Sequence, residues 1–104
     1  MNIAELVGIL EEIGFPVAYS QFNDPPSPPY ICYLVSHSSN FFADDEIYHE
    51  IENVQIELYT TKKDLLAERK VKEVLKAHEL VFETSEIYID SEKLFQKIFE
   101  VRLI

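Results

Sequence analysis

The stretch EIYHEIENVQIELYT, residues 46–60, decides the fold. Its side chains alternate between apolar and polar, which is typical of a β-strand with one buried face. The phase of the alternation changes between Ile51 and Val54, so a regular strand cannot keep all its apolar residues on one face. One extra residue near Glu52–Asn53 would restore the alignment. We therefore predict a long antiparallel strand with a bulge or a sharp twist at that position.

The chain before this strand predicts one helix and two further strands. Asn2 is a suitable N-cap residue, with Glu5 three positions later to complete a capping box. Apolar residues at helical spacing follow as far as Gly14, which is a suitable residue to end a helix. A short strand is predicted over Phe15–Tyr19. A central strand is predicted over Tyr30–Ser36, because apolar residues occur there at both parities.

The connection between these two strands, residues 20–29, is rich in proline. Prolines fix their own φ angle and bias the preceding residue toward extended backbone, so they mark the start of the strand at Tyr30. No Lys or Arg lies nearby and a buried strand follows at once, which argues against a proline-rich docking peptide. Cys32, the single cysteine, is interpreted as a small buried side chain.

The chain after residue 60 predicts a second helix and two more strands. Thr60 or Thr61 is the expected N-cap of the helix, which has an apolar stripe on one face. Leu80–Asp90 is predicted as a strand with an interruption near Thr84–Ser85. Residues 91–104 fit either a helix or a strand, and their aromatic and β-branched content favours a strand.

Together these elements predict a single α+β domain over residues 1–104. The expected order is α-β-β-β-α-β-β, with an antiparallel sheet, two helices packed on one face and a long bulged hairpin strand. A length of 104 residues with 47% hydrophobic residues suits one domain with one core. The longest apolar run, Ile31–Val35, is too short to span a bilayer, so no membrane association is expected.

The charge of the chain is distributed unevenly. The net charge is −10, and no Lys or Arg occurs before Lys62. Basic and acidic residues are interleaved over 62–79, which predicts a solvated helix face with pairs such as Glu68–Lys72. The alternative is that this basic face meets an acidic face of another copy. Direct sequence-specific nucleic-acid binding is not expected, because contact with phosphates requires a basic surface.

No pattern in the sequence selects a catalytic reaction. Two glycines cannot build a glycine-rich phosphate loop. Serines beside His37 do not form a triad unless the fold brings an acid to them. The spacing of Glu46 and His49 suits metal ligands on a helix, but in a strand these positions face opposite sides. We expect no catalytic residue, no metal and no cofactor, and hence a protein that is not an enzyme.

An aromatic pair between two predicted strands is the strongest candidate for an interaction site. Phe41 and Phe42 lie in a polar segment that is predicted as a loop, and three acidic residues follow them. Loop aromatics beside charges can anchor a protein interface, although they can also fold onto their own core. The predicted protein-interaction residues are Phe41, Phe42, Asp44, Asp45, Glu46 and Tyr48.

Three stretches resemble small prophage-encoded tail proteins of siphophages that infect Gram-positive bacteria. They are PPYICYL (28–34), SNFFADDEIYHEIENVQIELYTTKKD (39–64) and ETSEIYIDSEKLFQKIFEVRL (83–103). The resemblance covers roughly residues 25–104 and is a diffuse pattern without a catalytic signature. This chain has Asp44-Asp45-Glu46 where that group has a shorter acidic or Asn-containing stretch.

The resemblance implies a tail terminator, tail-completion or head–tail joining protein. Such subunits are small α+β proteins that assemble as a ring, typically a hexamer, at the head-proximal end of the tail tube. The implied partners are further copies, the tail-tube protein and head-connector proteins. The implied location is the virion, assembled in the cytoplasm of the bacterial host. By position, the segment Phe41–Glu46 would be a loop before the long hairpin strand and the contact surface.

A second function is compatible with the same residues. The chain would then be a small cytosolic protein-binding module or regulator that uses the Phe41–Glu46 loop to hold one partner. Oligomeric state and neighbouring genes distinguish the two functions, because only the first requires a ring and adjacent capsid and tail genes.

Overall fold

The strand predicted over residues 46–60 is the middle strand of a five-stranded sheet. The computed structural model describes residues 1–43 and 46–103 and, within these ranges, the side chains outside 37–50. The elements are α1 (Ile3–Glu11), β1 (Val17–Tyr19), β2 (Tyr30–Ala43), β3 (Glu46–Thr60), α2 (Leu65–Ala77), β4 (Phe82–Ile89) and β5 (Leu94–Leu103). The α+β class and the order α-β-β-β-α-β-β are confirmed.

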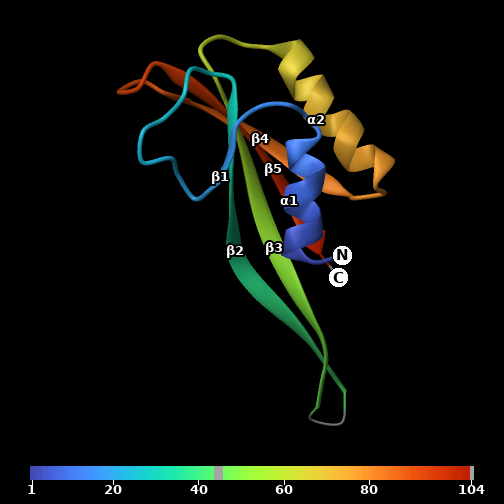
Figure 1. The fold of residues 1–104 in the computed structure, drawn as a ribbon. Helices are drawn as coiled ribbons and strands as arrows, with labels where there is room; N and C mark the ends of the chain where they lie inside the picture. The colour runs from blue at the N-terminus through green and yellow to red at the C-terminus, as the bar shows by residue number, and fades with distance from the viewer. Residues whose placement is uncertain (44–45, 104) are drawn as a thin grey trace.

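Both helices cover the same face of the sheet, as predicted (Figure 1). The strand order is β1-β2-β3-β5-β4, and α1 and α2 contribute apolar side chains to one core against its inner strands. The fully buried side chains of this core are Leu6, Leu10, Ile31, Val54, Ile56, Leu58, Val71, Leu75, Phe99 and Val101. Neither α1 nor α2 is long and apolar enough to cross a membrane.

The sheet is mixed, so the prediction of a wholly antiparallel sheet is wrong at one edge. β1 pairs with β2 in parallel, with Val17 opposite Ile31 and Tyr19 opposite Tyr33. A parallel pair requires a connection that returns the chain to the starting end of the first strand. Residues 20–29 provide this return, so the proline-rich loop is a crossover as well as the start of β2. The remaining pairs, β2–β3, β3–β5 and β4–β5, are antiparallel.

The two helix starts differ in how well the sequence predicted them. The Asn2 side chain accepts a hydrogen bond from the backbone N–H of Glu5 at 2.8 Å, which confirms that cap. The second helix is not capped by Thr60 or Thr61, since β3 continues to Thr60. Its cap is Asp64, whose Oδ1 accepts from the Ala67 N–H at 3.0 Å.

The predicted pair Glu68–Lys72 is also wrong, because Glu68 points inward. It is 5% exposed and forms ion pairs with Lys63 at 2.7 Å and with Lys97 of β5 at 3.7 Å. Lys63 also contacts Glu86 of β4 at 2.7 Å. These contacts raise the pKa of Lys63 and tie the start of α2 to the two strands beneath it.

The predicted bulge in the long strand is wrong in detail. Val35 pairs with Val54 and His37 with Asn53, so the extra residue near Asn53 is Ser36 of the partner strand β2. The Ser36 hydroxyl donates to the carbonyl oxygen of Asn53 at 3.0 Å. β3 itself stays in register with β5 over 52–60, because a continuous ladder of hydrogen bonds holds it there.

Two C-terminal segments whose structure was uncertain from the sequence form the strands β4 and β5. β5 runs from Leu94 to Leu103, so the favoured strand interpretation of this region is confirmed. β4 pairs with β5 from Phe82 to Ile89 without a shift in register, so the expected interruption near Thr84–Ser85 is absent. β4 forms one edge of the sheet and β1 the other.

β2 and β3 continue well beyond the rest of the sheet. β1 pairs with β2 only at residues 31–33, and β5 pairs with β3 only as far as Glu52. Beyond these points the two strands pair with each other alone, up to Ala43 opposite Glu46. Figure 1 shows this extension as a hairpin that projects past both helices. We call residues 37–43 and 46–51 the arm, and the remaining described residues the body.

Candidate interaction surfaces

The aromatic and acidic residues predicted to make contacts are in the arm. Register places Phe41 opposite His49, Phe42 opposite Ile47 and Ala43 opposite Glu46. The expectation of a loop at Phe41 and Phe42 is therefore wrong, because both belong to β2 (Figure 1). A strand forms there because β3 supplies an antiparallel partner for the whole length of the segment.

Of the other residues predicted for this site, Glu46 and Tyr48 belong to β3. Tyr48 is the extra residue of a second register shift, between the pairs Phe41–His49 and Phe42–Ile47. Asp44 and Asp45 lie outside the described residues. The fold thus gathers Phe41, Phe42, Glu46 and Tyr48 on two paired strands at the far end of the arm.

The outer side of α2 presents a second surface. Leu65, Arg69, Lys72 and Lys76 recur at intervals of four, three and four residues, which aligns them along one line of a helix. Leu65 is 66% exposed, Arg69 and Lys76 are exposed and Lys72 is half-buried. We call these four residues the α2 stripe.

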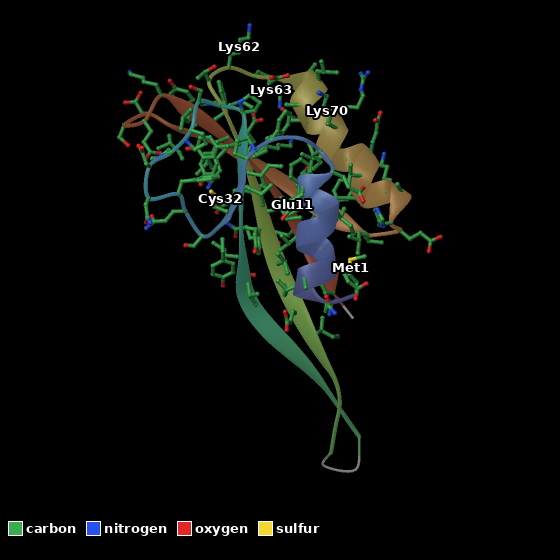
Figure 2. The ribbon with its side chains drawn as sticks, in the orientation of Figure 1. Met1, Glu11, Cys32, Lys62, Lys63 and Lys70 are labelled. Atoms are coloured by element: carbon green, nitrogen blue, oxygen red, sulfur yellow. The ribbon has the colours of Figure 1, made fainter. Side chains whose placement is uncertain are left out.

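The three cations of the α2 stripe have no acidic partner among the described residues, whose ion pairs use other side chains. Of the two acids on α2, Glu68 is turned inward to Lys63 and Lys97, whereas Glu73 is exposed beside the stripe. Lys70, on the side of α2 toward α1, lies 5.5 Å from the centre of the Phe15 ring. In Figure 2, Lys70 lies on α2 and Lys62 and Lys63 on the loop before it, at the end of the molecule away from the arm.

A buried polar network lies on the sheet face that carries no helix. Glu57 is 5% exposed, and its carboxylate accepts hydrogen bonds from Gln55 Nε2 at 2.6 Å and from the Tyr59 hydroxyl at 2.9 Å. Gln96 Nε2 donates to the same Tyr59 hydroxyl at 2.8 Å. Each buried side-chain N or O atom of the described residues has a hydrogen-bond partner, so the network links β3 and β5 without an unpaired buried charge.

Cys32 lies beside this network, opposite Glu57 in the β2–β3 pair. Burial, and then the negative charge of Glu57, raise the pKa of the Cys32 thiol to about 11. The same two causes raise the pKa of Tyr59. A thiol with so high a pKa is protonated at neutral pH, so it is a poor nucleophile and a poor metal ligand. This agrees with the interpretation of Cys32 as a buried core residue.

Sequence reasoning missed this network, although it noted the basic residues of the second helix. The alternation of β3 places Gln55, Glu57 and Tyr59 on one face, but it does not show that the face is covered. The covering comes from the crossover loop, where Phe22 packs edge-on against Tyr30 at 5.4 Å and Tyr30 stacks on Tyr59 at 4.9 Å. The sequence did not show that Glu68 turns inward, away from the other charged residues of the helix.

No cluster of three or more His, Cys, Asp or Glu side chains in the described part of the chain is placed to hold a metal ion. A groove of about 610 Å³ lies at the root of the arm, and the residues that line it include Ser36, Asn53, Val81, Glu83 and Arg102.

No model of a known protein family matches the chain, and no curated protein matches it.

Proposed function

We propose that this chain is a non-enzymatic structural subunit of a phage or prophage tail. It assembles as a ring at the end of the tail tube, as a tail terminator or a head–tail joining protein. The observation that carries the proposal is the arm, a paired extension of β2 and β3 that leaves the body and exposes two strand edges. Natural proteins usually cover or shorten such edges, because they pair readily with other chains.

The arrangement of charge supports a ring of identical subunits. A closed ring requires a heterologous interface, in which one surface of a subunit meets a different surface of its neighbour. The chain has two unlike surfaces, an arm without a single Lys or Arg and a helix that carries free cations. They lie in different parts of the molecule (Figure 1), as a head-to-tail contact requires.

The overall charge suits a protein at a channel for DNA. With a net charge of −10, the chain as a whole repels the phosphate backbone. A ring through which DNA passes benefits from weak contact with phosphates, because strong contact would retard the passage. The resemblance of residues 28–34, 39–64 and 83–103 to small siphophage tail proteins points to the same role.

The proposal is tested by assembly of the purified chain with tail tubes. Light scattering measures the mass of the chain alone and with the tail-tube protein encoded beside its gene, and electron microscopy locates it on the tubes. We expect a ring of several copies at one end of each tube and an end to tube growth. A protein that stays monomeric at all concentrations and does not bind tubes contradicts the proposal.

The same measurements detect the alternative, a protein-binding module that uses residues 41–46 to hold one partner. That function predicts a complex of one chain with one partner, and no ring on tail tubes. The genes beside that of the chain give an independent test, since a tail protein is expected next to capsid and tail genes.

A further inference from the structure

The two edges of the sheet differ in how they are protected against pairing with another chain. β1, at one edge, is three residues long, and Pro16 comes directly before it. A short strand beside a proline is a usual means of blocking an edge, because proline has no N–H to donate. β4, at the other edge, has eight residues without Pro, Gly or Lys and pairs with β5 without a bulge. One edge of the sheet is therefore blocked and the other is open.

The open edge is also accessible and partly apolar. Six consecutive residues of β4, Glu83–Tyr88, are exposed. Ile87 is 52% exposed and Tyr88 is 47% exposed, and Val81, directly before the strand, is 85% exposed. A further strand added at such an edge pairs with its backbone N–H and C=O groups and covers its apolar side chains. The edge of β4 is therefore a suitable site for a strand from another chain.

One register makes β4 complementary to a second copy of itself. A two-fold symmetric antiparallel pair places one residue opposite its own copy. With Ser85 at this centre, the pairing extends over the whole strand. Phe82 of one copy would then lie opposite Tyr88 of the other. Val81 would likewise lie opposite Ile89. Aromatic and aliphatic cross-strand pairs of this kind stabilise a sheet, and here they occur at both ends of the contact.

The charges of β4 also fit this register. Glu83 would face Ile87 of the other copy and Glu86 would face Thr84, so no two acids are directly opposite. Glu86 is in addition paired with Lys63 of its own copy at 2.7 Å. If the centre moved to Glu86, two carboxylates would face each other, which is unfavourable. If it moved to Thr84, the residues from Ile87 onward would face the loop before β4. Charge and length therefore both favour the register centred on Ser85.

We propose that the outer edge of β4 pairs with β4 of a second copy, in an antiparallel, two-fold symmetric contact centred on Ser85. The sheets of the two copies then form one continuous sheet, with the helices of both copies on the same face. The contact is isologous, so it differs from the heterologous contact that a ring requires. It lies outside the arm and does not rest on the proposed function.

The first test is disulfide cross-linking at the centre of the contact. In the variant Ser85→Cys, the two introduced thiols lie on residues that face each other. Facing residues of an antiparallel pair have Cα atoms about 4.5–5.5 Å apart, which a disulfide can span. We expect mild oxidation with diamide to convert most of the variant to a covalent dimer on a non-reducing gel. Cys32 does not compete, because it is buried.

Ile87→Cys is a matched control for the register. Ile87 is exposed, belongs to the same strand and lies two residues from Ser85, on the same face. In the proposed register its two copies are four residues apart along the strands, or about 14 Å at ~3.4 Å per residue. This exceeds the reach of a disulfide, so this variant should stay monomeric on the same gel. Equal cross-linking at both positions, or none in Ser85→Cys, overturns the proposal.

The second test measures the contact in solution without a covalent link. Ser85→Glu places two carboxylates opposite each other and near Glu83 of each copy, so dimerisation should weaken at least about tenfold. Ser27→Glu makes the same change at an exposed position of the crossover loop and should dimerise as the parent chain does. Sedimentation over a range of concentrations compares them, and circular dichroism checks that each variant folds. A folded Ser85→Glu variant that dimerises as the parent does contradicts the contact.

A mixture of two variants tests the symmetry of the contact. Ser85→Glu mixed with Ser85→Lys should form a heterodimer about as readily as the parent chain forms its dimer, because opposite charges then face each other at the centre. Native mass spectrometry distinguishes the heterodimer from either homodimer by mass. A mixture without heterodimer would show that Ser85 does not face its own copy.

The outcomes also distinguish this contact from the proposed function. Dimerisation is measured on the purified chain without tail tubes, and a chain without the arm should dimerise as the parent does. A parent chain that stays monomeric, or a dimer that is lost with the arm, overturns the contact at β4. If the chain dimerises through β4 but forms no ring on tail tubes, the proposed function fails and this contact stands.

Discussion

The strands β2 and β3 run through both the body and the arm, but different contacts surround them in the two regions. In the body, β2 and β3 lie in a five-stranded sheet with helices on one face, and their inward side chains are buried. In the arm the strands have only each other. An isolated two-stranded hairpin is at best marginally stable in water, so the arm depends on the body that anchors it. The body thus provides stability, and the arm is free to provide contacts.

The same substitution in the two regions gives the sharpest contrast. Phe99 is fully buried between the helices and the sheet, packed edge-on against Phe82 at 5.8 Å. Phe99→Ala should lower the free energy of unfolding by about 4 kcal/mol, because it leaves a cavity in the core. Phe41→Ala in the arm should lower it by less than about 1 kcal/mol. Urea unfolding of both variants measures the difference, and equal losses would show that the arm belongs to the core.

A smaller effect is expected where the body holds a buried charge. Glu68→Gln should cost about 2 kcal/mol, because it leaves Lys97 partly buried without its anion and removes a partner of Lys63. Glu73→Gln makes the same chemical change at an exposed position of the same helix and should cost almost nothing. Thermal unfolding compares the two. A loss of similar size in both variants would mean that the inward ion pairs contribute no stability.

The smallest effect expected concerns the thiol on the helix-free face of the body. The folded chain keeps the Cys32 proton up to about pH 11, whereas the unfolded chain releases it near 9.0. Proton release therefore favours the unfolded state, and stability falls as the pH rises from about 9 to about 11.

Cys32→Ala removes this contribution, so its stability should fall by about 1 kcal/mol less than that of the parent chain between pH 8 and pH 10. Part of the fall should remain in the variant, because Tyr59 and Lys63 also have raised pKa values and act in the same direction. Urea unfolding at the two pH values gives the comparison. An identical fall in both chains would place the thiol in contact with solvent.

Most elements of the body were predictable because each has a local cause. The Asn2 cap, the turn at Gly14 and the alternation of β3 act over a few residues, and the structure follows them. The parallel pairing of β1, the position of the first bulge and the inward turn of Glu68 were not predictable. Each depends on which strand lies alongside, and this is set by the whole sheet.

The first strand of the arm was predicted as a loop for a related reason. Residues 37–43 are mostly polar, and a polar segment between strands is typical of a loop. Pairing with β3 overrides that preference, since an antiparallel partner satisfies the backbone of both strands whatever their side chains. The candidate residues were found from their aromatic and acidic character, but their grouping on two paired strands required the fold.

Removal of the arm tests the central claim most directly. Ser38 and Glu52 are paired, so a two-residue Asn-Gly turn in place of residues 39–51 should close the shortened hairpin and keep the pairing of Glu52 with β5. We predict that this variant unfolds with a free energy within about 1 kcal/mol of the parent chain and neither forms rings nor binds tail tubes. A variant that unfolds far more easily, or that still assembles on tail tubes as the parent does, would contradict a stable body that carries an arm for assembly.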